Sequence, residues 1–236
     1  MRSCLIQLLI TVAVVFGLLW FGLPFGASWL ATSALNATGF TGTDTRVEVS
    51  AKLPPRLLLG HADKVRVTSN QVGVGDLHAA SIDVTLGDVE LIDRTIGTVN
   101  GTLTGVLLPA PNGDAVTIDT ATVDGSGTAA VATLAVSSAE AERLAESQLK
   151  AQTGVTATVK FAATNNVTVT INGKSEPGHL VVKDGALLLV PVSLALPTVT
   201  LIGTGNGNPF QFTVVSVGSA TVTLVGTIDL QALLGL

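Results

Sequence analysis

The sequence predicts an α+β protein with a mainly antiparallel β-sheet, one main α-helix and an N-terminal membrane segment. Apolar and polar residues alternate through most of the chain after residue 45, one capped helical pattern interrupts the alternation, and a continuous apolar run opens the chain. No strand–helix–strand rhythm repeats, which favours an antiparallel over a doubly wound parallel sheet. We therefore divide the chain into a membrane anchor or signal segment at residues 1–26, a linker at 27–44 and a β-rich domain at 45–236.

The N-terminal segment has the length and composition of a transmembrane helix. Residues 4–23 are apolar except for Gln7 and Thr11, and about 20 apolar residues in a helix cross a bilayer. Arg2 precedes the run and the next basic residue is Arg46, so the charge distribution keeps the N-terminus in the cytoplasm and exports the rest. We expect a single-pass protein of the cell membrane with an extracytoplasmic C-terminal domain. Cleavage after the apolar run, as in a signal peptide, would instead give a secreted or periplasmic protein.

The strands of the domain are predicted from alternation with a period of two. Apolar residues recur at every second position with Thr, Ser or charged residues between them, as in half-buried strands. The clearest segments are 46–53, 64–68, 81–86, 155–161, 167–171 and 222–224. The pairs Asn172-Gly173 and Asp184-Gly185 are typical of short hairpin turns. We therefore expect most neighbouring strands to pair antiparallel.

One helix is predicted at residues 137–152. Ser137 and Glu140 form a capping-box pattern at its start, and Gly154 follows its end. Its apolar positions recur at helical spacing and are expected to face the sheet. These positions include Leu144 and Leu149. A shorter helical segment is expected at residues 55–59, ended by Gly60.

The composition argues against several classes of function. The chain has 12 Lys and Arg against 17 Asp and Glu and shows no basic stripe, so we expect no nucleic-acid partner. The single cysteine, Cys4, cannot form a disulfide or a cysteine-based metal site within one chain. No metal-binding or nucleotide-binding motif is complete, so we expect neither a metal nor a cofactor.

The titratable residues give no clear sign of catalysis. His61, His78 and His179 stand in unrelated surroundings without a G-x-S-x-G elbow, so we expect no triad and no enzyme. Because His61 follows the predicted helix stop, we expect it to contact helix-terminal carbonyls. A hydrolase remains an alternative if strand carboxylates meet in space. These carboxylates are Asp83, Asp88, Glu90, Asp93 and Asp119.

The domain has more aliphatic surface than one helix can cover. Residues 186–192 are apolar on both faces of a strand, and residues 57–59 are also continuously apolar. A second sheet could cover this surface, as in a sandwich. Alternatively, the surface forms an apolar groove that holds acyl chains. Physical reasoning alone leaves both explanations open.

The chain resembles a known family in its N-terminal membrane segment and in segments 46–60, 62–67 and 82–91. Together these are similar to the LmeA-like phospholipid-binding family of actinobacterial cell envelopes. The family is similar in architecture to tubular lipid-binding proteins. The resemblance implies a long, curved, mainly antiparallel sheet wrapped around the main helix, with a groove for lipid tails. It also implies a phospholipid ligand of the phosphatidylinositol type.

These arguments predict an extracytoplasmic protein that holds or shuttles phospholipid in the envelope by burying acyl chains, without covalent chemistry. The alternatives are a structural envelope β-protein without ligand and a glycan or lipid hydrolase. The expected partners are phospholipid and the membrane. The aliphatic residues expected in the groove are Val47, Val49, Leu53, Leu57, Leu58, Leu144, Leu149, Leu188, Leu189 and Val190.

Overall fold

A computed structural model describes residues 40–74, 77–90, 93, 95–126, 129–192, 196–204 and 210–228 of the 236-residue chain. The predicted membrane segment and most of the predicted linker lie outside these residues. Within the described part, no helix is both long enough and apolar enough to cross a bilayer. The first strand begins at Thr41, so it starts inside the predicted linker.

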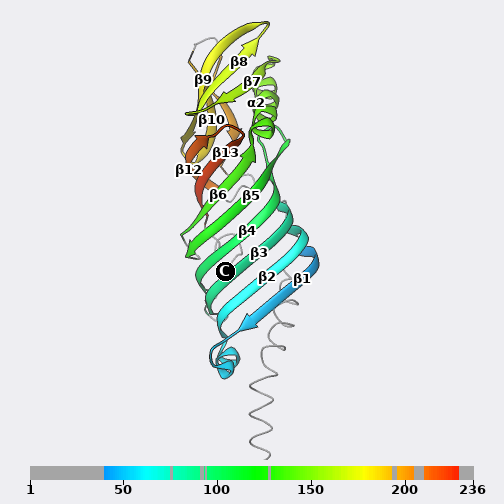
Figure 1. The fold of residues 1–236 in the computed structure, drawn as a ribbon, viewed down its shortest axis with the longest axis vertical. Helices are drawn as coiled ribbons and strands as arrows, with labels where there is room; N and C mark the ends of the chain where they lie inside the picture. The colour runs from blue at the N-terminus through cyan, green and yellow to red at the C-terminus, as the bar shows by residue number, and fades with distance from the viewer. Residues whose placement is uncertain are drawn as a thin grey trace, which may run out of the picture.

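The described residues are mostly in β-strands, with one α-helix and one short 3-10 helix (Figure 1). The strands before the α-helix are β1 (Thr41–Ser50), β2 (His61–Val74), β3 (Leu77–Glu90), β4 (Thr95–Pro109), β5 (Ala115–Ser126) and β6 (Ala130–Ser137). The helices are η1 (Pro54–Leu59) and α2 (Ser138–Thr153). The strands after α2 are β7 (Thr158–Ala162), β8 (Asn166–Ile171), β9 (Lys174–Lys183), β10 (Ala186–Pro191), β11 (Val199–Ile202), β12 (Phe210–Val217) and β13 (Thr221–Ile228).

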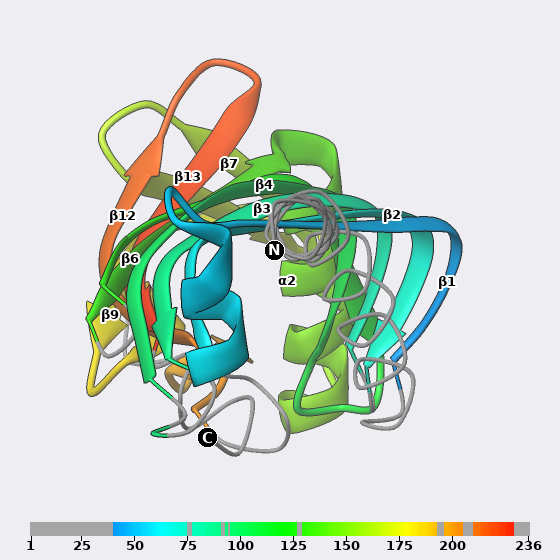
Figure 2. The same cartoon turned by 90° about the horizontal axis from the view of Figure 1, so that it is seen from below.

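The strands form two sheets. The large sheet has eight strands in the order β1-β2-β3-β4-β5-β6-β13-β12, and the small sheet has five in the order β11-β10-β9-β8-β7. Neighbours pair antiparallel throughout the described strands. Figure 2 looks along the long axis and shows the large sheet curling into an arch. The predicted mainly antiparallel α+β class is confirmed, and the sheet is curved as the resemblance implied.

The large sheet presents one aliphatic face and one polar face. Directly opposed residues form rows across it, and one row contains only aliphatic residues, Gly and Phe. This row is Val47, Val67, Val84, Gly101, Val123, Ala132, Gly226 and Phe212. The neighbouring row on the other face begins Glu48, Arg66, Thr85, Asn100 and Asp124. The alternation in the sequence therefore places the aliphatic side chains on the concave side.

Two glycines in the aliphatic row allow neighbouring strands to approach closely. A Cβ atom at Gly101 would lie 2.8 Å from the carbonyl oxygen of Asp83, and one at Gly226 would lie 2.7 Å from that of Gln211. Glycines inside strands are typical of tight bends in curled sheets. We therefore attribute part of the curl to these two positions.

The helix α2 begins and ends as its sequence predicts. The Ser137 hydroxyl accepts the backbone N–H of Glu140, and Gly154 adopts the left-handed conformation at the C-cap. The Glu140 carboxylate does not complete a capping box; it accepts the N–H of Thr117 on β5 and pairs with Arg143. Leu144 and Leu149 are buried, as predicted.

The helix lies at one end of the molecule, between the two sheets. Its main contacts are with β5, β6 and β13 of the large sheet and with β7 and β11 of the small sheet. The resemblance implied a sheet that wraps the helix along a groove. At 16 residues, α2 is about 24 Å long, too short to follow the concave face from end to end.

Side chains of α2 also bind both outer strands of the small sheet. Glu146 accepts the N–H of Val159 at 2.9 Å and Glu142 accepts that of Phe161 at 3.0 Å, both on β7. At the other edge, the Gln152 side-chain amide bonds the carbonyl and the N–H of Thr200 on β11. Free strand edges invite pairing with other chains. The helix therefore protects both edges.

Candidate functional site

The part of the concave face away from α2 is the first candidate site. Six aliphatic residues of β2, β3 and β4 are only half-buried there, although they lie in the aliphatic rows. We call them the inner strip. They are Val65, Val67, Ile82, Val84, Leu86 and Leu103. The inner strip packs against both apolar clusters of the protein and keeps some accessible apolar area.

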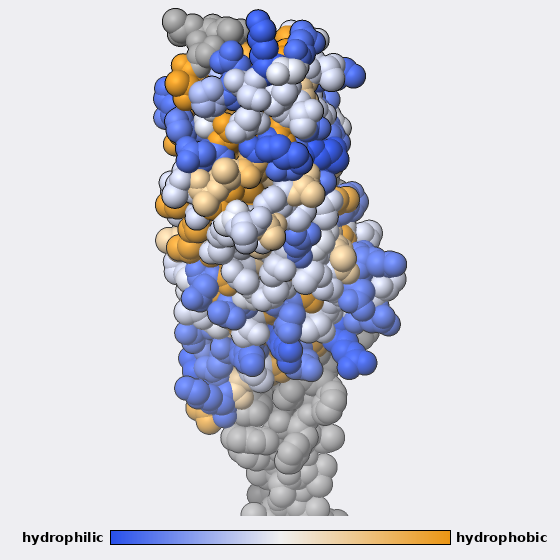
Figure 3. Space-filling view, turned by 45° about the horizontal axis from the view of Figure 1, so that its top comes forward, coloured by the Kyte–Doolittle hydropathy of each residue, from blue (hydrophilic) through white to orange (hydrophobic). Residues whose placement is uncertain are grey.

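Five of the predicted groove residues lie at the η1 end of this face. Val47 and Val49 are buried in a small cluster with Ala62 and Val89, against which Leu57 packs half-buried. In contrast, Leu53 and Leu58 are 55% and 62% exposed. Figure 3 shows a polar surface with apolar groups, including a small one at the lower end, where Figure 1 places η1.

The remaining predicted groove residues lie near α2 or on β10. Leu144, Leu149 and Leu189 are fully or almost fully buried in the main core. A cavity of about 10 Å³ adjoins Leu144, which is room for one water molecule at most. Leu188 and Val190 are half-buried and alternate with the buried residues of β10. Among the described residues, the core that packs on α2 therefore leaves no space for an acyl chain without rearrangement.

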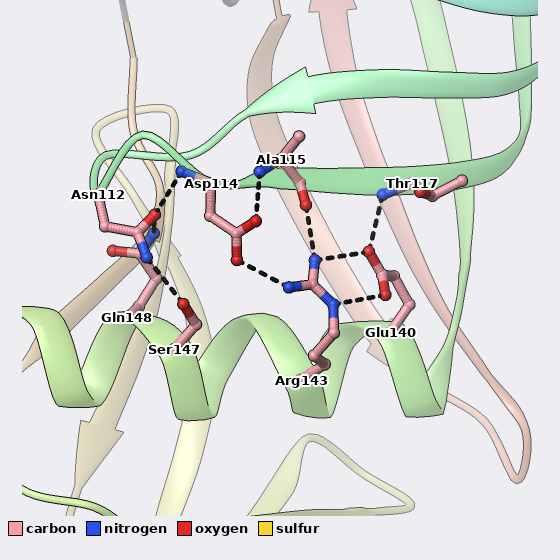
Figure 4. Close-up of polar contacts among 8 residues, drawn as sticks. All are labelled: Asn112, Asp114, Ala115, Thr117, Glu140, Arg143, Ser147 and Gln148. Atoms are coloured by element: carbon pink, nitrogen blue, oxygen red, sulfur yellow. Dashed lines mark hydrogen bonds and ion pairs between the residues drawn. The ribbon is translucent and has the colours of Figure 1, made fainter.

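A polar network joins α2 to the loop between β4 and β5 (Figure 4). Arg143 donates to Glu140, to Asp114 at 2.7 Å and to the carbonyl of Ala115. Its guanidinium is the main cause of the lowered pKa of both carboxyl groups. The buried Gln148 donates to Asn112 in the same loop. These groups satisfy one another, so we regard the network as structural.

A second candidate site lies beside η1, where the start of β2 pairs with the end of β3. His61 Nδ1 bonds the carboxylate of Glu90, and His61 Nε2 lies 3.3 Å from Asp63 Oδ1. The other oxygen of Asp63 accepts the backbone N–H of Lys52 at 2.5 Å. Donor atoms of His61, Asp63 and Asp88 all lie within 4.8 Å of one another. We call these residues, with Glu90, the His61 cluster.

Hydrogen bonds shift the pKa values of His61 and Asp63 in opposite directions. The hydrogen bond with Glu90 is the main reason why the pKa of His61 is raised, and the bond with Asp63 acts in the same direction. The Lys52 N–H is the main cause of the lowered pKa of Asp63, with His61 and Arg56 contributing. Bonds to these two carboxylates replace the expected contact between His61 and helix-terminal carbonyls. The register of β2 with β3 sets Glu90 opposite His61.

The other histidines and acids do not gather into a catalytic arrangement in the described part of the chain. His78 and His179 are exposed on β3 and β9, away from His61. Asp83 forms a two-point ion pair with Arg66, at 2.8 and 2.9 Å. Asp119 is exposed on β5, with β4 between it and β3, and Asp93 lies in the turn after β3.

Sequence reasoning missed the His61 cluster because its members lie on two strands. The only local signal is that His61 and Asp63 stand two residues apart, and that Asp88 and Glu90 do the same. Their meeting depends on the register that sets His61 opposite Glu90. That register follows from the long hairpin between β2 and β3 and not from any motif.

The chain was compared with known proteins and structures. No protein-family model, curated protein or solved structure matches it. The resemblance to LmeA-like proteins therefore stays a prediction from the sequence segments that suggested it.

Proposed function

We propose that the protein binds phospholipid by burying acyl chains against the inner strip of its curled sheet. The observation that supports this proposal is a concave face whose aliphatic side chains on β2, β3 and β4 keep accessible surface, while α2 packs at the other end. The predicted membrane segment would hold this domain beside a supply of lipid. The resemblance to LmeA-like proteins favours a phosphatidylinositol-type head group.

The energetics of such binding come from desolvation of hydrocarbon. Each buried methylene contributes about 0.8 kcal/mol, so twelve of them give on the order of 10 kcal/mol before the costs of ordering are subtracted. No charged residue of this chain has to act as acid, base or nucleophile. The protein would hold or shuttle lipid in the cell envelope without changing it.

Neighbouring residues of β4 provide a matched test. Leu103 belongs to the inner strip and Thr102 is exposed on the opposite face. The native tryptophans, Trp20 and Trp29, are first replaced by Phe, and then Leu103→Trp and Thr102→Trp are made separately in the full chain. Both variants are placed in vesicles whose phospholipids carry brominated acyl chains, which quench tryptophan on contact.

We expect bromine to quench the fluorescence of the Leu103→Trp variant strongly and that of the Thr102→Trp variant weakly, relative to vesicles without bromine. Equal quenching would mean that the whole strand enters the bilayer, and no quenching would favour the structural protein without ligand. Repeating the measurement with brominated phosphatidylinositol and phosphatidylcholine compares head groups.

A further inference from the structure

We propose that the His61 cluster binds a divalent transition-metal ion of the zinc class, through His61 Nε2, Asp63 Oδ1 and a carboxylate oxygen of Asp88. The three donor groups come from β2 and β3, and their donor atoms lie within 4.8 Å of one another. This proposal is independent of lipid binding, because the cluster is separate from the inner strip.

The spacing of the donor atoms fits a small metal ion. Zinc binds imidazole nitrogen and carboxylate oxygen at about 2.0–2.2 Å in tetrahedral geometry, which places two ligands roughly 3.3 Å apart. The distance between His61 Nε2 and Asp63 Oδ1 is 3.3 Å. The donor atoms of the cluster lie within 4.8 Å of one another, so the third group needs a shift of at most about 1.5 Å to reach this separation. An exposed carboxylate such as Asp88 can make that shift.

Neighbouring groups hold His61 and Asp63 in place by hydrogen bonds, as the groups around metal ligands do in known metal sites. Glu90 bonds Nδ1 of His61, and such a carboxylate fixes the tautomer that leaves Nε2 free for a metal. The Lys52 N–H occupies Oδ2 of Asp63, so Oδ1 is the oxygen that faces His61. These two contacts are a second reason, besides proximity, to distinguish the site from a simple group of acids.

The carboxylate of Asp88 is available as the third ligand. Among the described residues, no hydrogen bond or ion pair involves its carboxylate, while it adopts a left-handed backbone conformation with φ of 49°. A Cβ atom at Gly97 would lie 2.8 Å from the Cβ of Asp88. The absence of a side chain at Gly97 on β4 therefore leaves room for the Cβ of Asp88.

Arg56 is the group that competes with a metal. Its guanidinium lies 3.5 Å from Asp63 Oδ1, the same oxygen that would bind the ion, and its side chain is 44% exposed. A metal would displace this long and weak contact. Imidazole in the ligand set favours zinc and related ions over magnesium or calcium, which prefer oxygen ligands.

The test is a calorimetric titration of the full chain with Zn²⁺, in detergent and after removal of metal with EDTA. We expect one ion per chain, at least tenfold weaker binding in His61→Ala and Asp88→Asn, and a 10- to 100-fold loss in Glu90→Gln. His179→Ala is the matched control, because His179 is exposed on β9, and it should bind as the parent does. Mg²⁺ at the same concentration should not compete.

The Arg56→Ala variant distinguishes a metal site from a cluster of ion pairs that binds no metal. Removal of the competing guanidinium should strengthen zinc binding by several-fold. Asp88→Asn keeps the shape of the side chain, and circular dichroism is used to check that this variant and His61→Ala are folded. The proposal is overturned if the parent chain binds no Zn²⁺ at millimolar concentration, or if folded Asp88→Asn and His61→Ala bind it as tightly as the parent.

Discussion

At the scale of single residues, the curl of the large sheet depends on glycines, which have no side chain at points where two strands approach closely. Gly101 stands in an aliphatic row whose other members are mostly Val and Ala, and the strand on its β3 side passes close to its Cα. Sequence reasoning recognised the alternation around it but not this role, because the alternation is the same whether a strand is flat or bent. The contact that requires glycine comes from Asp83 and Val84 on the preceding strand β3, so no pattern within β4 itself indicates it.

Gly101→Ala should therefore destabilise the fold. The new methyl group would meet the backbone oxygen of Asp83 at 2.8 Å and Val84 at a similar distance, and overpacking of this kind costs about 1–3 kcal/mol. Gly203→Ala is the control, since its Cβ would have no neighbour closer than 3.9 Å. Urea unfolding of both variants measures the difference, and equal stabilities would show that β3 and β4 can separate freely at Gly101.

At the scale of elements, local signals in the sequence predict α2 well. Ser137 caps the helix and Gly154 ends it within the few residues that carry these signals. The partners of its polar face could not be predicted, because they lie on β5, β7 and β11. The position of Glu140 predicts that its carboxylate completes a capping box. Instead, the carboxylate accepts hydrogen bonds from Arg143 and from the N–H of Thr117.

Arg143→Met should destabilise the protein at neutral pH and much less in acid. Arg143 lowers the pKa of Asp114 and Glu140 from their ordinary values of 3.8 and 4.5. A lowered pKa in the folded state stabilises the fold above the unfolded value, and this contribution disappears as the pH falls through the folded value. The difference in melting temperature between parent and variant should therefore shrink below about pH 4.

Melting curves between pH 7 and pH 2.5 test this dependence. Arg66→Met is the comparison, because the Arg66–Asp83 pair is exposed at both side chains and exposed pairs contribute little. A melting-point difference for Arg143→Met that is as large at pH 3 as at pH 7 would show that the arginine acts through its hydrocarbon part.

Glu146→Ala should weaken the attachment of β7 to the helix. The substitution leaves the backbone N–H of Val159, a fully buried residue, without its acceptor. An unpaired buried amide costs about 1–3 kcal/mol. Glu146→Gln keeps an acceptor oxygen and should lose much less, as measured by chemical unfolding. If the two variants are equally unstable, the charge and not the hydrogen bond holds β7.

At the scale of the whole molecule, the apolar interior is divided. The main cluster spans α2, the small sheet and the strands from β2 to β6 with β12 and β13, and a small cluster joins β1, β2 and β3 beside η1. The inner strip lies between them. Small clusters give less stability than large ones, so the β1 end should open before the rest of the protein.

Native-state hydrogen exchange tests this gradient with two core variants. Val89→Ala, in the small cluster, should speed exchange in β1 and β2 and leave β5 and β6 nearly unchanged. Leu134→Ala, in the main cluster, should speed exchange in every strand that exchanges by global unfolding. A uniform response to Val89→Ala would show that the two clusters unfold as one cooperative unit.

The pairing of β6 with β13 bears on how the chain is made. Ser137 lies opposite Thr221, and between these strands the chain forms α2 and the whole small sheet. During synthesis one edge of β6 therefore has no strand to pair with until β13, the last described strand, is made. By then α2 and β7–β11 can already have packed together. A growing chain in this state presents the β6 edge of a hydrophobic sheet to its surroundings. A chain that ends before β13 should therefore aggregate more readily than one that includes it.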